Sequence, residues 1–427
     1  MSYALCRWRA LATRAGAQLP LQAPRDNRGL LLVSPPSGGL LLASSAAGGG
    51  SLATAPARGL CCSVARASIM PAWQLQSYGG LDALRYNANT PFPIIVYPNE
   101  VVVRVHASSL NPIDAAMSRG YGARVLNTMR DPLRMNPRDS ELPLVLGRDC
   151  SGVIMECGVS VKHFRPGDEV WLALPPWKQG TFAEFVVASA NEVAHRPLRL
   201  SHEEAASIPY VALTAWSALV TTGGLNNKTA RGKRVLILGG SGGVGTFAVQ
   251  LLKAWGAHVT ATCSEDARPL LAGLGADHTL DYRHRDLPER ARALSPFDLV
   301  LDGVGGSLEQ WALRCLRPWT SAKYVTLVTP LLLNADRYGL GDGMVKSGLT
   351  LGRRVLSSFY SGVHYRWGFF TPNGPALDDI AELVNNKKIR PVVEKVLPFQ
   401  DVLKGLHAME RGHARGKTVV TIASAAR

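Results

Sequence analysis

The spacing of apolar residues divides the chain into a β-rich part and a part where strands and helices alternate. From residue 70 to about residue 209, stretches such as EVVVRVHAS (100–108) alternate apolar and polar positions between Gly, Pro and Asp. A period of two residues is typical of strands with one buried face, so a small β barrel or sandwich is expected. Residues 122–142 break this pattern with Arg, Asn, Pro and Asp, and an exposed loop is expected there.

From residue 210 the period changes. VALTAWSAL (211–219) has helical spacing, and short apolar strands then follow with helical runs between most of them. This alternation predicts a parallel α/β sheet. The expected strands are VLILGG (235–240), HVTATCS (258–264), HTLDY (278–282), DLVLDGVGG (298–306) and KYVTLVTP (323–330). The tail predicts a helix (377–386), a strand (392–399), a second helix (401–410) and a last strand (417–422).

Residues 1–68 differ in composition from the rest of the chain. They are rich in Ala, Gly, Ser, Leu and Arg, and Asp26 is their single acid. An Arg-rich, Ser-rich and acid-poor N-terminus is typical of a mitochondrial transit peptide, and an inert disordered tail is the alternative. The folded part is therefore expected to begin near Met70.

Charge and cysteine usage exclude several functions. The net charge is +15, yet no block of clustered Lys and Arg is interleaved with aromatic residues, so nucleic acid is not an expected partner. No run approaches the ~18 apolar residues that span a bilayer, so no transmembrane segment is expected. The seven cysteines include no C-x-x-C pair, and a secreted disulfide framework is not indicated.

The run VLILGGSGGVG (235–245) carries most of the functional information. An apolar strand, a glycine turn and a helical run ending before Gly256 form the dinucleotide-binding fingerprint, with Gly240, Gly242 and Gly245 as its three glycines. The helix N-terminus would hold the anionic phosphates. A nucleoside-triphosphate loop is a weaker alternative, because it requires Lys before the Ser or Thr, and here Gly245 precedes Thr246 directly.

The end of the second strand indicates which dinucleotide binds. NAD-selective folds place an acid there, about 20 residues past the glycines, whereas this strand ends at Ser264. Ser264 can donate a hydrogen bond to a 2′-phosphate, and Arg268 can neutralise it, so NADPH is the expected cofactor. The alternative is that Ser264 caps a helix and Arg268 is solvated. Glu265 and Asp266 follow Ser264 at once and oppose the preference for NADPH.

The order of these parts resembles the medium-chain dehydrogenase/reductase superfamily. The runs EVVVRVHASSLNPID, RPGDEVW, GTFAEFVV, LGADHTLDY and ARGKTVV resemble its zinc-free quinone-oxidoreductase branch over residues 70–424. The resemblance implies an α/β protein with a GroES-like catalytic domain (70–209) and a doubly wound Rossmann domain (210–370). A C-terminal segment (371–427) would complete the two-domain body.

The resemblance also implies site residues. Zinc-binding members have Cys at the place of Asn111 and a G-H-E run at the place of 147–149, so no metal site is expected here. The resemblance implies the following cofactor contacts beside the fingerprint: Ser241, Gly243 and Val244; Tyr282; Gly303, Val304 and Leu327; Gly368, Phe370 and Thr371; and His413, Ala414 and Arg415. Family members often have Asn at the position of Gly303. A surface role is the alternative for His413.

Without zinc, the simplest chemistry is hydride transfer to an electron-poor quinone or conjugated enone. Tyr121 matches the proton-donor tyrosine of related enoyl-thioester reductases, and Asn111 would orient nicotinamide or substrate; Tyr121 packing on the domain seam is an equal alternative. The expected function is an NADPH-dependent quinone or enone reductase of the mitochondrial matrix, linked to ubiquinone metabolism. An enoyl-thioester reductase and an NADPH-binding interaction protein are the alternatives. Homodimerisation and mitochondrial protein partners stay open.

Overall fold

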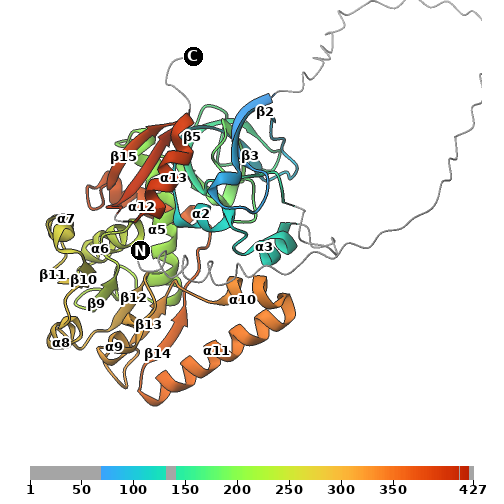
Figure 1. The fold of residues 1–427 in the computed structure, drawn as a ribbon. Helices are drawn as coiled ribbons and strands as arrows, with labels where there is room; N and C mark the ends of the chain where they lie inside the picture. Colours follow the sequence, from blue (N-terminus) through green and yellow to red (C-terminus); the bar gives the residue numbers. More distant parts are fainter. Residues whose placement is uncertain (1–68, 131–140, 413, 423–427) are drawn as a thin grey trace, which may run out of the picture. The chain divides into compact units, whose positions relative to one another are not determined.

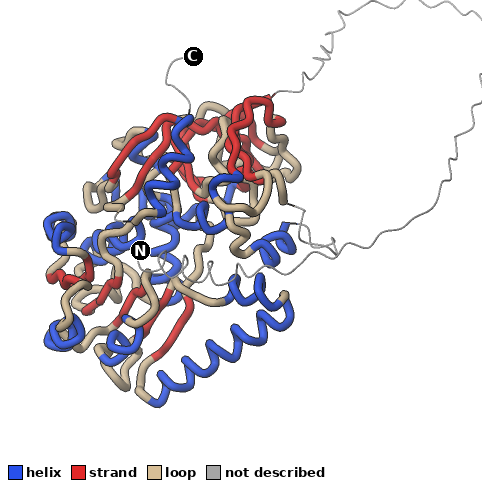
Figure 2. The backbone as a smooth tube through the Cα atoms, in the orientation of Figure 1, coloured by secondary structure: helices blue, strands red, loops and turns tan. Residues whose placement is uncertain are grey.

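The computed structural model describes residues 69–130, 141–412 and 414–422. The expected transit peptide and His413 lie outside the described residues. Figure 1 shows two β-sheet bodies, one with mostly antiparallel strands and one with parallel strands. In Figure 2, helices gather around the parallel strands, whereas strands and loops dominate the other body. The predicted α/β fold class is confirmed.

The first body contains a seven-stranded sheet of order β15-β16-β3-β5-β6-β8, in which β7 also pairs with β3. Val101, Val103 and Val105 of β3 share one apolar core, as the alternation predicts. A smaller sheet has the order β2-β1-β4. The elements of this part are β1 (Ile69–Leu75), η1 (Leu81–Ala83), β2 (Leu84–Pro91), β3 (Glu100–Ser109), α2 (Pro112–Ser118), α3 (Ala123–Arg130), β4 (Leu144–Val145), β5 (Asp149–Cys157), β6 (Glu169–Ala173), β7 (Phe185–Ser189), η2 (Ala190–Glu192), β8 (Val193–His195) and α4 (His202–Ala206).

Part of the expected loop at 122–142 is the helix α3, so the loop prediction is wrong for those residues. Its Ala, Leu, Met and Arg residues have good helix propensity, and Leu126 is buried. The carboxylate of Asp336 accepts hydrogen bonds from the backbone N–H groups of Gly122 (2.6 Å) and Arg124 (3.2 Å). The helix N-terminus is therefore satisfied by a residue more than 200 positions away, which local sequence does not reveal.

The C-terminal residues return to the first body. Their elements are α12 (Gly374–Asn385), β15 (Val393–Pro398), η5 (Phe399–Asp401), α13 (Val402–Glu410) and β16 (Lys417–Thr421). β16 pairs antiparallel with β3, with Val419 opposite Ser109, and β15 pairs parallel with β16. Lys417 therefore lies close to the residues that follow β3.

The second body is a six-stranded parallel sheet of order β11-β10-β9-β12-β13-β14. The residues of β9 from Val235 to Leu238 are at most 1% exposed, because helices pack on both faces of the sheet. The strand β14 was not predicted, and it forms one edge. The elements are α5 (Pro209–Trp216), η3 (Ser217–Thr222), β9 (Arg234–Leu238), α6 (Gly243–Ala254), β10 (His258–Cys263), η4 (Glu265–Ala267), α7 (Arg268–Gly273), β11 (His278–Asp281), α8 (Leu287–Ala293), β12 (Leu299–Asp302), α9 (Leu308–Arg314), β13 (Lys323–Thr326) and β14 (His364–Trp367).

Two further helices, α10 (Leu331–Tyr338) and α11 (Leu340–Tyr360), connect β13 to β14 and were not predicted. The two helices meet at a sharp turn and pack closely. A Cβ added to Gly343 would stand 2.5 Å from the Cα of Ala335. Figure 1 shows α10 near α3, with α11 extending away from it to β14.

One helical run among the described residues, His202–Thr222, has the length and composition of a membrane span, with a mean hydropathy of 1.2. About three quarters of it, 72%, is buried inside the structure. Val211, Leu213 and Ala215 belong to the core that also contains the helix α6. Packing inside the protein therefore accounts for its apolar composition.

Candidate active site

The glycine turn links β9 to α6 by a backbone path that side chains would block. Gly239 has φ +87°, a conformation that favours glycine. A Cβ on Gly240 would stand 2.8 Å from the Cβ of Ala261, and one on Gly245 would stand 2.3 Å from the carbonyl oxygen of Gly239. Gly240 and Gly245 therefore allow the turn and the helix to pack closely. Gly242 is the N-cap of α6, whose first backbone N–H groups are available to an anion.

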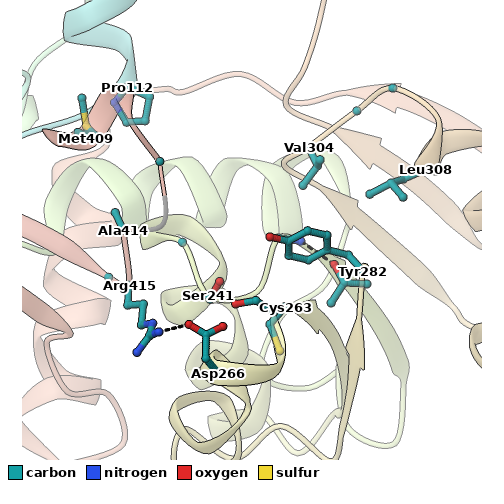
Figure 3. Close-up of a pocket in the computed structure, with 18 of the residues that line it drawn as sticks. Pro112, Ser241, Cys263, Asp266, Tyr282, Val304, Leu308, Met409, Ala414 and Arg415 are labelled. Atoms are coloured by element: carbon teal, nitrogen blue, oxygen red, sulfur yellow. Dashed lines mark hydrogen bonds and ion pairs between the residues drawn. The ribbon is translucent and has the colours of Figure 1, made fainter. Parts of the chain in front are cut away.

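A cavity of about 340 Å³ opens at this turn, between the ends of the parallel strands and the C-terminal segment (Figure 3). Its volume is in the range of small-molecule and cofactor sites. The predicted residues that line it are Ser241, Gly242, Ser264, Tyr282, Val304, Ala414 and Arg415. Residues that line it without having been predicted include Pro112, Cys263, Asp266, Leu308 and Met409. The predicted cofactor-binding residues outside this lining are Gly240, Gly243, Val244, Gly245, Arg268, Gly303, Leu327, Gly368, Phe370 and Thr371, and the two predicted catalytic residues, Asn111 and Tyr121, are also outside it.

The C-terminal segment forms one wall of the cavity beside the glycine turn. The backbone N–H of Gly416 donates to the carbonyl of Ser241 at 3.1 Å, and Gly416 forms a β-bridge with Gly242. The cradle combines these glycines with the N-terminus of a twelve-residue helix, so it suits a phosphate group.

The end of the cavity at Ser264 contains a charged pair. Arg415 forms an ion pair with Asp266, as Figure 3 shows. A hydrogen bond from Ser264 to Asp266 lowers the pKa of that carboxyl. Arg268 instead binds Glu265, with 2.9 Å between Nη1 and Oε1, and does not line the cavity. The guanidinium that reaches this end is therefore that of Arg415.

At the end of β12, a buried carboxylate that was not predicted from the sequence fixes the turn at Gly303 and Val304. Asp302 is fully buried, and its Oδ1 accepts from the N–H groups of Val304 (2.9 Å) and Gly305 (2.8 Å). Its Oδ2 accepts from the hydroxyl of Tyr324 at 2.6 Å. Such a network holds the turn rigidly against the cavity.

Predicted residues of the nicotinamide side lie close together. A Cβ on Gly368 would stand 3.2 Å from Cδ2 of Leu327. The ring of Phe370 stacks on Tyr210, with 4.4 Å between centroids, whereas Thr371 is exposed.

The amide of Asn111 is occupied by internal partners. Asn111 is 1% exposed and is the N-cap of α2. Its Nδ2 donates to the carbonyl of Ser109 (3.2 Å) and to Oδ1 of Asp149 (2.9 Å). Its Oδ1 accepts from Nζ of Lys417 at 2.5 Å. Both amide protons are used, so only the second lone pair of Oδ1 could reach a ligand.

Lys417 is itself a buried cation that the sequence analysis did not identify. Its Nζ also donates to the carbonyl of Leu110 at 2.9 Å. Burial lowers the pKa of Lys417, and the carboxylates of Asp149 and Asp114 oppose that shift. Burial likewise raises the pKa of Asp149, and Lys417 opposes it. The motif G-K-T-V-V (416–420), with which β16 begins, contains this lysine, but its hydrogen-bond partners Leu110 and Asn111 are about 300 residues away.

Tyr121 follows α2 and lies beside α10. Burial raises the pKa of Tyr121 to about 12, and the carboxylate of Asp336 adds to the shift. Tyr210 is a neighbour whose pKa burial also raises, and its backbone N–H donates to Oδ2 of Asp149 at 3.1 Å. The phenol of Tyr121 is therefore protonated throughout the neutral range.

The positions that hold zinc in the zinc-binding members contain a different network. Arg148 is fully buried, and its guanidinium donates to the carbonyls of Pro175, Lys178 and Val145 at 3.0–3.2 Å. Within the described ranges, one group of possible metal ligands comes close together, formed by Glu265, Asp281 and His284. Two of its three members are exposed, and Glu265 is bound to Arg268.

Comparisons with known proteins agree with this geometry. The family model of the alcohol dehydrogenase GroES-like domain matches residues 97–198, and that of the zinc-binding dehydrogenase matches residues 274–420. The mitochondrial NAD(P)H oxidoreductase RTN4IP1 of Homo sapiens is 59% identical over 357 residues, covering 84% of this chain and 90% of that protein. The Mus musculus protein of the same name is 58% identical over 367 residues, covering 86% and 93%.

A solved structure extends the similarity to the fold. The quinone oxidoreductase from Coxiella burnetii superposes with a TM-score of 0.67 at 29% identity, covering 83% of this chain and 99% of that chain. Together, the two sheets, the glycine turn and these similarities show that the chain belongs to the quinone-oxidoreductase-like branch of the medium-chain dehydrogenase/reductase superfamily and is a nicotinamide-dependent oxidoreductase.

Proposed function

We propose that the chain is a mitochondrial NADPH-dependent reductase that transfers hydride to a quinone or conjugated enone without zinc. The observation that carries this proposal is the cavity, which joins a phosphate cradle at Gly242 to a guanidinium at Arg415. The Asn111 and Lys417 network lies near its other end, where Pro112 contributes to the lining. Relatives named as mitochondrial oxidoreductases support the compartment.

The preference for NADPH rests on charge at the Ser264 end. Ser264 and Arg415 would bind a 2′-phosphate by a neutral and a charge-assisted hydrogen bond, with Tyr282 beside them. In the structure, the guanidinium of Arg415 forms an ion pair with the carboxylate of Asp266, and a 2′-phosphate would compete with that carboxylate. Arg268 would contribute through its longer-range charge, because Glu265 binds it directly.

The absence of zinc chemistry is proposed from the residues at the ligand positions. Asn111 is not a thiolate, and the guanidinium of Arg148 is a cation with donors only. The ammonium of Lys417 already binds Oδ1 of Asn111, so a divalent cation there would meet repulsion. Metal analysis of purified protein tests this proposal: one zinc ion per chain would contradict it.

Reduction needs a hydride and a proton from separate sources. When bound, the reduced nicotinamide supplies the hydride. Tyr121 would donate its phenolic proton to the oxygen that gains charge, and its raised pKa keeps the phenol protonated before the transfer. The hydrogen bond between Asn111 and Lys417 would fix the position of α2 relative to the glycine turn. The stacked rings of Tyr210 and Phe370 would exclude water from the site.

Turnover tests the function directly. Purified full-chain protein is mixed with NADPH or NADH and a panel of short-chain ubiquinone analogues, conjugated enones and enoyl thioesters, and cofactor absorbance is followed. We expect oxidation of NADPH with quinones or enones. Turnover of enoyl thioesters alone would favour a thioester reductase. Binding of NADPH without oxidation across the panel would favour an interaction protein.

Localisation and a link to ubiquinone metabolism need cellular tests. We expect the full chain in the mitochondrial matrix, and loss of import when residues 1–68 are removed. Unchanged import of the shortened chain would contradict the transit peptide. Cells lacking the protein are expected to contain less ubiquinone; normal ubiquinone content would contradict that link.

A further inference from the structure

The outward face of α11 is apolar, which reverses the usual pattern of a surface helix. Of its 21 residues, those buried against the protein include the small residues Gly343, Ser347 and Ser358. At 100° per residue, the opposite face contains Val345, Leu349, Leu356, Phe359 and Tyr360. Each of these five side chains is more than half exposed. The helix therefore presents its large apolar groups to the outside.

An aromatic cluster extends this face at the C-terminal end of the helix. Trp319 is 76% exposed, and its backbone N–H donates to the carbonyl of Gly362 at 2.8 Å. A Cβ on Gly362 would stand 2.8 Å from the indole ring. Trp319 thus lies beside the turn that follows Phe359 and Tyr360, whose rings are 6.5 Å apart. Trp and Tyr side chains favour the boundary between lipid and water.

Basic residues line one side of the apolar face. Lys346 and Arg353 are exposed and lie about 80–100° from Val345 around the helix. The only acid of α11 is Asp342 in its first turn, and Arg354 is already paired with Glu309 at 2.9 Å. An apolar face with a cationic edge matches a bilayer that carries anionic headgroups.

We propose that the outward face of α11, together with Trp319, docks on an anionic phospholipid bilayer, with the helix lying in the plane of the interface. A second copy of the chain is a poorer fit. The helix is 21 residues long, about 30 Å, so its face offers only a few hundred Å², below the ~800 Å² per partner of a stable interface. If two copies paired through antiparallel α11 helices about a two-fold axis, Lys346 and Arg353 of both copies would lie on the same side of the pair. Their positive charges would repel one another there.

Docking has a consequence for the candidate active site. Cδ1 of Leu332 in α10 would stand 3.2 Å from a Cβ on Gly122, and Asp336 in the same helix binds the N–H of Gly122. The helix pair therefore touches the turn that carries Tyr121. A bilayer bound at α11 would therefore be connected through this helix pair to the turn that carries Tyr121. This consequence rests on the proposed function, whereas docking itself rests on α11 and Trp319.

Vesicle binding with a local readout tests the proposal. Full-chain protein without cofactor or substrate is mixed with vesicles of equal parts phosphatidylcholine and phosphatidylglycerol. Amide hydrogen exchange in residues 340–360 is then measured, since this readout is independent of the basic N-terminus. We expect protection there with anionic vesicles and little with phosphatidylcholine alone. Absence of protection while the protein sediments with anionic vesicles would overturn the proposal.

Paired substitutions complete the test. The variant Leu356→Glu/Phe359→Glu should abolish the protection in α11 and lower the vesicle partition coefficient by about tenfold or more, because two exposed apolar groups that would enter the bilayer are lost. Leu198→Glu is the matched control, since Leu198 is 87% exposed elsewhere, and it should bind like the wild type. NADPH binding by each variant verifies its fold. A wild-type dimer that becomes monomeric in the double variant without vesicles would overturn the proposal in favour of a second copy.

Discussion

Nζ of Lys417 lies 2.5 Å from Oδ1 of Asn111, across 306 residues of sequence. The same side chain packs on the start of α6, where a Cβ on Gly243 would stand 2.9 Å from Cδ of Lys417. One buried lysine therefore touches both the helix of the glycine turn and the residue expected to orient the nicotinamide. Because both contacts come from β16, the relative position of Asn111 and the turn depends on the C-terminal strand.

The variant Lys417→Met should be unstable and slow. Removing the ammonium takes away the positive charge that opposes the raised pKa of the buried Asp149 and the hydrogen bond to Oδ1 of Asn111, so the free energy of unfolding should fall by about 1–3 kcal/mol. Urea denaturation measures this loss, and steady-state kinetics should show a lower kcat because Asn111 loses its tether. Adding Asp149→Asn should restore part of the stability, since no unpaired charge then remains. Equal losses in the single and the double variant would contradict an electrostatic coupling between Lys417 and Asp149.

The same variant should show a characteristic pH dependence. Without Lys417, the folded-state pKa of Asp149 rises further above its unfolded value of ~3.9, so the folded state binds the proton more tightly. Stability of the variant should therefore increase as pH falls from the raised folded pKa toward ~3.9. Its deficit relative to the wild type should shrink over that window. If the difference in unfolding free energy between the variant and the wild type were constant with pH, the lost stability would come from packing and not from the charge of Lys417.

Tyr121→Phe should lower kcat by roughly 10²–10⁴-fold if the phenol donates the proton. Since burial raises the pKa of Tyr121 to about 12, the wild-type kcat should show no alkaline loss from this group across ordinary assay pH. Tyr78→Phe is the matched control, because the Tyr78 ring is 3.4 Å from a Cβ on the adjacent Gly120, and it should retain turnover. Full activity of Tyr121→Phe would refute the donor role.

Arg415→Ala should weaken NADPH binding by about 10–100-fold and leave NADH within a few-fold, because a charge-assisted hydrogen bond is lost only to the 2′-phosphate. Arg268→Ala should have a smaller effect, since Glu265 already binds that guanidinium. Asp266→Asn should tighten NADPH binding by freeing Arg415. Fluorescence titration of both cofactors measures all three. Equal losses of NADPH and NADH in Arg415→Ala would contradict the assignment.

Local patterns predicted the fold better than they predicted the site. The strand β9, the turn and the helix α6 are adjacent in sequence, and apolar spacing with glycine punctuation was sufficient to predict them. The helix α11 escaped prediction because its apolar positions face outward and its buried positions are small, which reverses the usual signal. The helix α3 escaped because Asp336 satisfies its N-terminus from a distance.

The site depended on long-range contacts that a single sequence does not reveal. Ser264 and Arg268 are near neighbours in sequence, so the sequence suggested that they act together. The structure instead brings Arg415 to Ser264 through the C-terminal segment, and Glu265 binds Arg268. The Asp302 network likewise depends on Tyr324, which belongs to the next strand of the sheet.

Gly245→Ala should abolish cofactor binding. The substitution Gly348→Ala, on the surface of α11, serves as its control. The methyl group added at Gly245 would stand 2.3 Å from the carbonyl oxygen of Gly239, a backbone atom that cannot rotate away. The turn must therefore shift, at a cost of about 1–3 kcal/mol, and the N–H groups of α6 no longer converge on the phosphates. Gly348→Ala meets no atom within 4 Å on exposed α11, and should stabilise the protein by ~0.5–1 kcal/mol through helix propensity. Urea unfolding of both variants measures stability, and NADPH titration measures cofactor binding. If Gly245→Ala bound NADPH like the wild type, the close packing of Gly245 on the carbonyl of Gly239 would not be needed for cofactor binding.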